Sequence, residues 1–311
     1  MTGPLLAPVL TGDLWAGYAS VFQKQFFQHA LLAAVLVGAL CGVVGTYVVL
    51  RGYAFIGDAL AHATFPGVAV AYVTGTNILG GGLAAGLVTA TLIGLLARHR
   101  RVSNDTAIGV LFAGAFALGV MLISRIRSYR KDLADLLFGN LLGVSRTDLL
   151  IIVAVATLVL ALVATFYREL LLSAFDPTYA AALGYPSWAL DLLLLGLLTL
   201  TIVVGLQAVG NVLVVAMVVT PSAAARLLTD RVPAMMGLGA LLGAAAGGLG
   251  LVASYPLDLA PGATIVLVST LFFLLALLFA PRHGYVTARL AQRRAPAAER
   301  VVGGVVADRE A

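Results

Sequence analysis

Residues 31–50 read LLAAVLVGALCGVVGTYVVL and contain no charged side chain. A helix needs about 20 predominantly apolar residues to cross a bilayer, which is the length of this run. The stretch that begins at Ala30 is also too long for a cleaved signal peptide, and further apolar stretches follow it. It therefore predicts the first membrane-spanning helix.

The composition extends this interpretation to the rest of the chain. The 311 residues are 61% hydrophobic and only 11% charged, whereas an ordinary soluble domain has roughly 25% charged residues. Too few charges remain to cover a soluble surface, so lipid must be the outer solvent. We predict an all-α, polytopic membrane helix bundle with eight or nine transmembrane helices, two of them short and interrupted by Pro66 and Pro221. The predicted spans are residues 29–50, 54–73, 78–97, 106–124, 148–167, 190–209, 210–228, 234–254 and 262–281.

The regions outside and between the spans carry the positive charge. Residues 1–27 are predicted to form an interfacial N-terminal lead-in, residues 28–281 the transmembrane domain, and residues 282–311 a basic, partly disordered cytoplasmic tail. The basic loop at residues 98–101 and the tail should both face the cytoplasm, because cytoplasmic loops carry an excess of Lys and Arg. With nine crossings, residues 167–190 are then cytoplasmic as well.

Glycine spacing predicts where helices pack closely, and the cysteine content limits which covalent and metal sites the chain can form. Gly38 and Gly42 are four apart, as are the members of a second series of glycines at positions 239, 243 and 247. In lipid, small residues permit close backbone approach, so both sets predict helix packing. The single cysteine, Cys41, excludes a disulfide framework and a Cys metal cluster within the chain.

Two ionisable residues interrupt the second apolar segment, which reads GDALAHATFPG over residues 57–67. Asp58 and His62 are four apart, so on a helix they share one face. A charge at the bilayer centre costs at least about 2.5–3.5 kcal/mol, which makes such residues candidates for function. A carboxylate and an imidazole suit Mn²⁺, Zn²⁺ or Fe²⁺. The alternative is that Asp58 caps a helix that starts near Gly57, with His62 hydrogen-bonded to it.

Spacing alone favours that alternative, because two ligands are too few for a tight cation site. A symmetric dimer with this helix near its axis would bring two Asp and two His together, and the cation site would then have four ligands.

A second motif, FDPTYAAALGYP over residues 175–186, has the signals of a short helix. Asp176 fits an N-cap, Pro177 the first helical position, and Gly184 a C-terminal stop. The motif predicts a two-turn helix at about residues 176–186, between spans and on the cytoplasmic side. Such a helix could lie on the membrane surface, or it could dock onto a motor protein.

Several catalytic motifs are missing from the sequence. The only lysines are Lys24 and Lys131, and neither follows the glycine of a Gly-x-x-x-x-Gly-Lys phosphate-binding loop. His-Glu-x-x-His and Gly-x-Ser-x-Gly are also absent. We therefore expect a chain that is not an enzyme and binds no ATP through such a loop.

Taken together, these stretches resemble the membrane permeases of bacterial ABC importers for manganese, zinc and iron. The resemblance runs from about Phe27 to Phe279, nearly the whole apolar region. The motifs that carry it are the first span ending in Val49-Leu50-Arg51, residues 57–63 (GDALAHA), 105–109 (DTAIG), 137–142 (LFGNLL), 175–177 (FDP), 209–213 (VGNVL) and 256–267.

The resemblance implies a type II ABC importer-like permease in the bacterial plasma (inner) membrane. It implies a homodimer or a dimer with a paralogous permease, cytoplasmic ATP-binding subunits that hydrolyse ATP, and an extracytoplasmic metal-binding protein. No cofactor is expected to be bound permanently, and the transported cation is Mn²⁺, Zn²⁺ or Fe²⁺. The family's translocation-path residues match Asp58 and His62. Its ATPase-coupling segment matches Phe175, Asp176, Pro177, Ala181 and Gly184.

Two other functions stay open at this stage. A permease for a metal chelate such as a siderophore would need a wide path without ligands. An ATP-independent secondary metal transporter would need no ATP-binding subunit.

Overall fold

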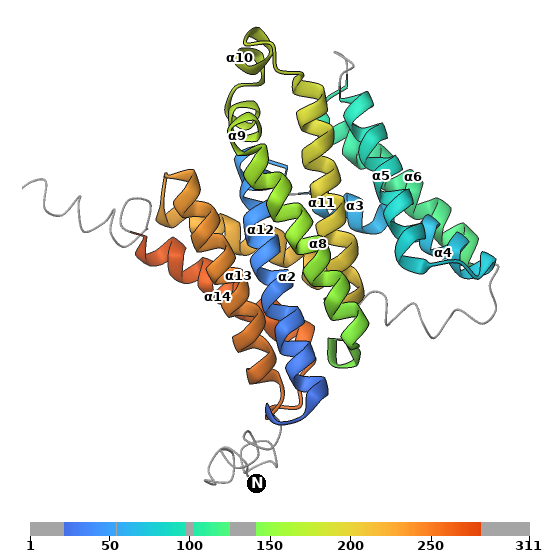
Figure 1. Ribbon diagram of the computed structural model, residues 1–311, viewed down its shortest axis with the longest axis vertical. Coiled ribbons are helices and arrows are strands. Elements are labelled where there is room, and N and C mark those ends of the chain that lie inside the picture. Colours follow the sequence, from blue (N-terminus) through green and yellow to red (C-terminus); the bar gives the residue numbers. More distant parts are fainter. Residues whose placement is uncertain (1–21, 54, 98–101, 125–140, 281–311) are drawn as a thin grey trace, which may run out of the picture.

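The computed structural model describes residues 22–53, 55–97, 102–124 and 141–280, and within these ranges all regular structure is helical. The helices are α2 (Gln25–Leu50), α3 (Ile56–Ala63), α4 (Phe65–Thr74), α5 (Ile78–Leu96), α6 (Asn104–Ser124), the 3-10 turn η1 (Leu141–Gly143), α8 (Arg146–Thr165), α9 (Tyr167–Phe175), α10 (Pro177–Ala182), α11 (Ser187–Val209), α12 (Asn211–Leu228), α13 (Val232–Ser254) and α14 (Pro261–Phe279). Figure 1 shows them packed as one elongated bundle.

The predicted spans are confirmed as helices. In the described part of the chain, eight helical segments are long and apolar enough to cross a membrane, and the ninth, Leu213–Leu228 of α12, is apolar but shorter. The chain is therefore a multi-pass membrane protein of the all-α class, with eight or nine crossings as expected. α2 begins at Gln25, three residues before the boundary predicted for the transmembrane domain.

Only one of the two proline-interrupted spans is broken. The second span divides at Thr64 into α3 and α4, and Pro66 lies in the first turn of α4. The Thr64 hydroxyl donates to the carbonyl oxygen of Ala61 at 2.7 Å, in the last turn of α3. α12, in contrast, continues through Pro221. Its next residue, Ser222, is buried and donates a hydrogen bond to the Gly42 carbonyl at 3.0 Å, so packing against α2 supports the helix there.

The two predicted glycine series pack against each other. A Cβ added at Gly38 would overlap the backbone of Gly243, and one added at Gly42 would overlap that of Gly239. Gly247 approaches the backbone of Ala34 in the same way. α2 and α13 therefore meet backbone to backbone, a contact that small residues make possible in a membrane.

Burial separates inner from outer helices. Within the single chain, 67% of the 18-residue apolar stretch of α2 is buried, and the same share of that of α11. Only 17% of the corresponding stretch is buried in α6, and 22% in α8 and in α14. The outer helices are thus available to lipid or to another subunit.

Two contacts mark the opposite ends of the bundle. At one end, the Phe27 ring at the start of α2 lies 6.0 Å, centroid to centroid, from the ring of Tyr255, which follows α13. At the other end, Arg51 closes α2 and forms an ion pair with Asp191 near the start of α11. α10 lies at this second end, at the top of Figure 1.

Some predictions fall outside the described residues. These are the first 21 residues of the lead-in, the basic loop at residues 98–101 and the tail at residues 282–311.

Candidate functional site

The turn between α2 and α3 fixes the direction of the helix that carries Asp58 and His62. Gly52 has a φ of 70°, and its N–H donates to the carbonyl of Val49 at 3.2 Å. The Tyr53 N–H donates to the Val48 carbonyl at 3.0 Å. These two bonds form a Schellman motif, in which the left-handed position favours glycine. α3 starts three residues later, at Ile56.

Asp58 and His62 share one face of α3, as predicted. The His62 Nε2 lies 3.4 Å from the Asp58 Oδ1, and the side chains are 20% and 46% exposed, respectively. The capping alternative holds only in part. α3 begins before Asp58, and its N-cap, Phe55, makes no side-chain capping bond. Among the described residues, the Asp58 carboxylate has this contact with His62 and no bond to a backbone N–H, so it remains open to a ligand.

A third polar residue, Asn211, meets the imidazole. Its Nδ2 lies 3.3 Å from Nδ1 and 3.4 Å from Nε2 of His62. Asn211 is 1% exposed and is the first residue of α12, after Gly210 with a φ of 86°. Its Oδ1 is buried without a hydrogen-bond partner. Asn211 belongs to the motif at residues 209–213, but its sequence spacing gave no sign of a contact with His62.

Aromatic rings enclose the rest of the imidazole. Ring centroids of Phe65, Phe112 and Phe116 lie 5.5, 5.5 and 5.2 Å from that of His62. These rings restrict rotation of the imidazole and lower the local dielectric, so the polar side of the site is the one shared with Asp58 and Asn211.

The site is incomplete as a cation cage within one chain. Among the described residues, no group of three or more His, Cys, Asp or Glu side chains could hold a metal ion. One chain thus supplies a carboxylate, an imidazole and an amide, and the carboxylate is nearly half exposed.

The predicted short helix is present as α10. The Asp176 Oδ1 accepts a hydrogen bond from the Tyr179 N–H at 2.8 Å, and Pro177 is the first helical residue. Gly184 has a φ of 88°, and its N–H donates to the Ala181 carbonyl at 3.0 Å. The N-cap, the first position and the stop are therefore where the sequence predicted them.

The surface around α10 carries many exposed apolar side chains. Phe175 is 59% exposed at the end of α9, and Ala181 is exposed on α10 itself. The large apolar side chains of four neighbouring residues are exposed as well: Tyr179, Leu183, Tyr185 and Trp188. An exposed apolar group of this kind is typical of a surface that another protein covers.

Comparison with known proteins gives consistent matches. Residues 23–280 match the profile of the family described as ABC 3 transport family. The manganese transport system membrane protein MntC of Halalkalibacterium halodurans is 47% identical over 270 residues, which cover 87% of this chain and 92% of the relative. The chelated iron transport system membrane protein YfeD of Yersinia pestis is 37% identical over 83% of this chain and 86% of its own length.

One solved structure has the same fold. It is described as PsaBC from Streptococcus pneumoniae in complex with Fab, and it is similar to this chain with a TM-score of 0.80 and 38% sequence identity. The match covers 88% of this chain and 99% of the solved chain.

Proposed function

Because the chain belongs to the ABC 3 transport family and is a permease subunit of an ABC transporter, we propose that it carries divalent metal ions into the cell, with Mn²⁺ as the first candidate. The observation that supports this most directly is the Asp58–His62 pair on a helix that is otherwise apolar. A carboxylate oxygen and an imidazole nitrogen suit first-row divalent ions, whereas Mg²⁺ and Ca²⁺ prefer oxygen ligands alone.

The cation site would be shared between two permease copies. A single chain offers two ionisable ligands, and the half-exposed Asp58 carboxylate can face a second copy. A two-fold axis beside α3 would bring together two carboxylates and two imidazoles. Asp58 compensates the charge of the passing ion, and His62 gives preference over hard ions. The partner copy is the same chain or a paralogue.

Movement of the cation is driven by ATP that separate subunits hydrolyse on the cytoplasmic face. These subunits would dock on α10 and the exposed apolar side chains around it. An extracytoplasmic metal-binding protein would deliver the ion at the opposite end, where Phe27 and Tyr255 meet.

The test is uptake by the assembled transporter. The permease, tagged and purified with the ATP-binding subunits that it retains, is reconstituted into liposomes with its delivery protein. We expect ATP-dependent uptake of radioactive Mn²⁺ that excess Zn²⁺ or Fe²⁺ inhibits and Mg²⁺ does not. Uptake that is equally fast without ATP would contradict the proposal.

A chelated metal is the second candidate cargo, because the relative YfeD is named for chelated iron transport. Chelated ions keep their own ligands, so their uptake should not depend on His62. Uptake of an iron chelate that is unchanged in His62→Gln would favour this candidate.

Asn211→Leu tests the polar neighbour of His62. The change keeps the side-chain volume but removes the amide that meets the imidazole, and loss of such an orienting partner typically costs 10–100-fold in metal affinity or activity. We expect Mn²⁺ uptake at limiting concentration to fall about 10-fold. Asn77→Leu, which removes the cap of α5 instead, is the matched control. Mn²⁺ uptake at the wild-type rate by both variants would exclude a role for Asn211.

Ala181→Glu tests the docking surface. Ala181 is exposed on α10, so the permease should fold with a glutamate there. A charge placed in an apolar interface should nevertheless reduce recovery of the ATP-binding subunits about 10-fold or more in affinity purification. The melting temperature of the isolated permease is the control. Full recovery of the ATP-binding subunits would place their docking site elsewhere.

A further inference from the structure

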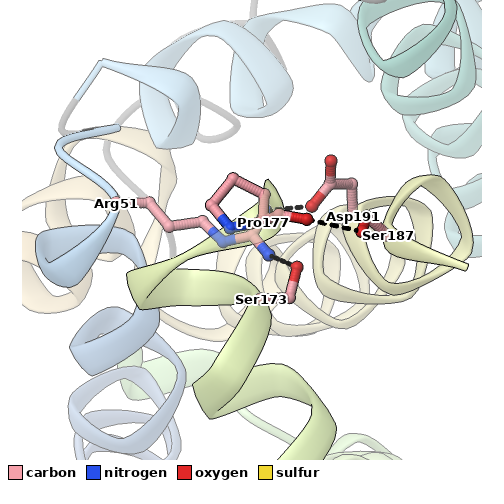
Figure 2. A network of polar contacts seen from close by, with 5 residues as sticks. All are labelled: Arg51, Ser173, Pro177, Ser187 and Asp191. Atoms are coloured by element: carbon pink, nitrogen blue, oxygen red, sulfur yellow. Dashed lines mark hydrogen bonds and ion pairs between the residues drawn. The ribbon is translucent and has the colours of Figure 1, made fainter. Parts of the chain in front are cut away.

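One buried arginine joins three helices at the end of the bundle that carries α10. The Arg51 side chain is 7% exposed, and its Nη1 forms an ion pair with the Asp191 carboxylate. Its Nη2 donates to the Ser173 hydroxyl at 2.9 Å, and Ser173 is 3% exposed. Figure 2 shows the guanidinium reaching toward both partners.

The two partners of Arg51 flank α10 in the chain. Ser173 lies on α9, just before α10, and Asp191 lies on α11, just after it. α11 is also tied to α10 directly, because the Ser187 hydroxyl donates to the Pro177 carbonyl at 3.1 Å (Figure 2). Ser187 and Asp191 are one helical turn apart on α11. One guanidinium therefore holds both segments from which α10 extends.

The backbone of Arg51 is joined by a short turn to α3, the helix that carries Asp58 and His62. Arg51 is the C-cap of α2, and the Schellman turn at Gly52 and Tyr53 joins it to α3. The Ile56 N–H, at the start of α3, donates to the Tyr53 carbonyl at 3.0 Å. Asp58 follows Arg51 by only seven positions. A displacement of the guanidinium is thus passed through a short, hydrogen-bonded turn to the helix that carries the carboxylate.

Three further polar atoms on α2 and α9 have no hydrogen-bond partner among the described residues. The Arg51 Nε, the Tyr47 hydroxyl and one carboxylate oxygen of Glu169 are buried without partners. Tyr47 lies one turn before Arg51 on α2, and Glu169 one turn before Ser173 on α9. Buried polar atoms of both α2 and α9 therefore lie one turn along the chain from Arg51 and Ser173.

We propose that Arg51 is a positioning residue that passes movements of α10 to α3, and so links ATP hydrolysis to the opening of the Asp58–His62 site. This inference rests on the function proposed above. A buried charge that loses its partner is strongly disfavoured. When α9 and α11 move with α10, the ion pair and hydrogen bond pull Arg51 with them, and its movement reaches the start of α3 through the turn at Gly52 and Tyr53.

The test measures ATP hydrolysis and Mn²⁺ uptake on the same proteoliposomes of the full transporter. Arg51→Gln and Asp191→Asn should each lower uptake about 10-fold while hydrolysis stays within about twofold of the wild type, as expected for loss of a coupling interaction. The number of ions moved per ATP therefore falls. A purely structural role would lower both rates together, in proportion to the amount of folded transporter.

Three further variants keep the outcome decisive. Arg51→Asp combined with Asp191→Arg restores opposite charges and should recover part of the lost coupling. Ser173→Ala removes a single hydrogen bond of Arg51, so it tests the coupling even if the charge variants do not assemble. For this variant we expect about fivefold fewer ions moved per ATP. Arg231→Gln removes an exposed arginine before α13 and should leave the ratio unchanged.

The inference fails if Ser173→Ala and the charge variants that assemble keep the wild-type ratio of uptake to hydrolysis. It also fails if both rates fall in parallel. Absence of ATP-dependent Mn²⁺ uptake in the wild type would instead contradict the proposed function, so the two failures are distinguishable.

Discussion

Asp58→Ala is expected to reduce Mn²⁺ uptake to the background of empty liposomes, a loss of about 100-fold or more. If Asp58 touches the ion, as proposed, its loss should matter at least as much as the loss of partners that only orient ligands, which costs about 10–100-fold. The carboxylate is the negative charge of the described site, and a divalent ion without compensation in a medium of low dielectric is strongly disfavoured. ATP hydrolysis and uptake in reconstituted transporter measure the effect.

The fold should survive this change. The Asp58 side chain is 46% exposed and makes no capping bond to the backbone in the described structure. Asp105→Ala, on the exposed first turn of α6, is the matched control and should transport normally. Asp58→Asn keeps the size of the side chain and removes its negative charge, so this variant shows whether uptake depends on the charge. Normal uptake by Asp58→Ala would remove the residue from the cation path.

Gly42→Ala should have the largest effect on folding. The added methyl would overlap the backbone of Gly239 on α13, and backbone cannot move aside as a flexible side chain can. Overpacking of a well-packed interior costs about 1–3 kcal/mol and occasionally more, and a rigid contact belongs at the upper end. We expect a lower yield of monodisperse protein in detergent and a clearly lower melting temperature.

Gly109→Ala is the control for that change. A Cβ at Gly109 on α6 meets nothing within 4 Å, so the same methyl should be tolerated there and should favour the helix by about 1 kcal/mol. If both variants melt at the wild-type temperature, the close contact between α2 and α13 does not exist in the folded protein.

Much of the fold could be predicted because its signals are local. Long apolar runs predicted every described span to within a few residues, since crossing a bilayer sets a minimum length. The ends of α10 followed from Asp176, Pro177 and Gly184, each of which acts on neighbouring backbone groups. The pairing of Asp58 with His62 followed from helical spacing alone. Their role as cation ligands stays a prediction.

Contacts between distant segments could not be predicted in this way. Asn211 meets His62 across 149 positions, and Arg51 meets Asp191 across 140. Spacing contains no information about which apolar helices become neighbours, because most faces of a membrane helix look alike. The sequence could not show that α12 continues through Pro221 for the same reason, since the helix is supported there by its packing against α2.

The glycine contact between α2 and α13 limits how the transporter can move. At the glycines, the backbone of α2 touches the backbone of α13, and sliding of one helix along the other should bring larger side chains into these close contacts. We therefore expect these two helices to move together through the transport cycle. Changes of access are then expected in other helices, among them the span that divides at Thr64 and holds Asp58 and His62.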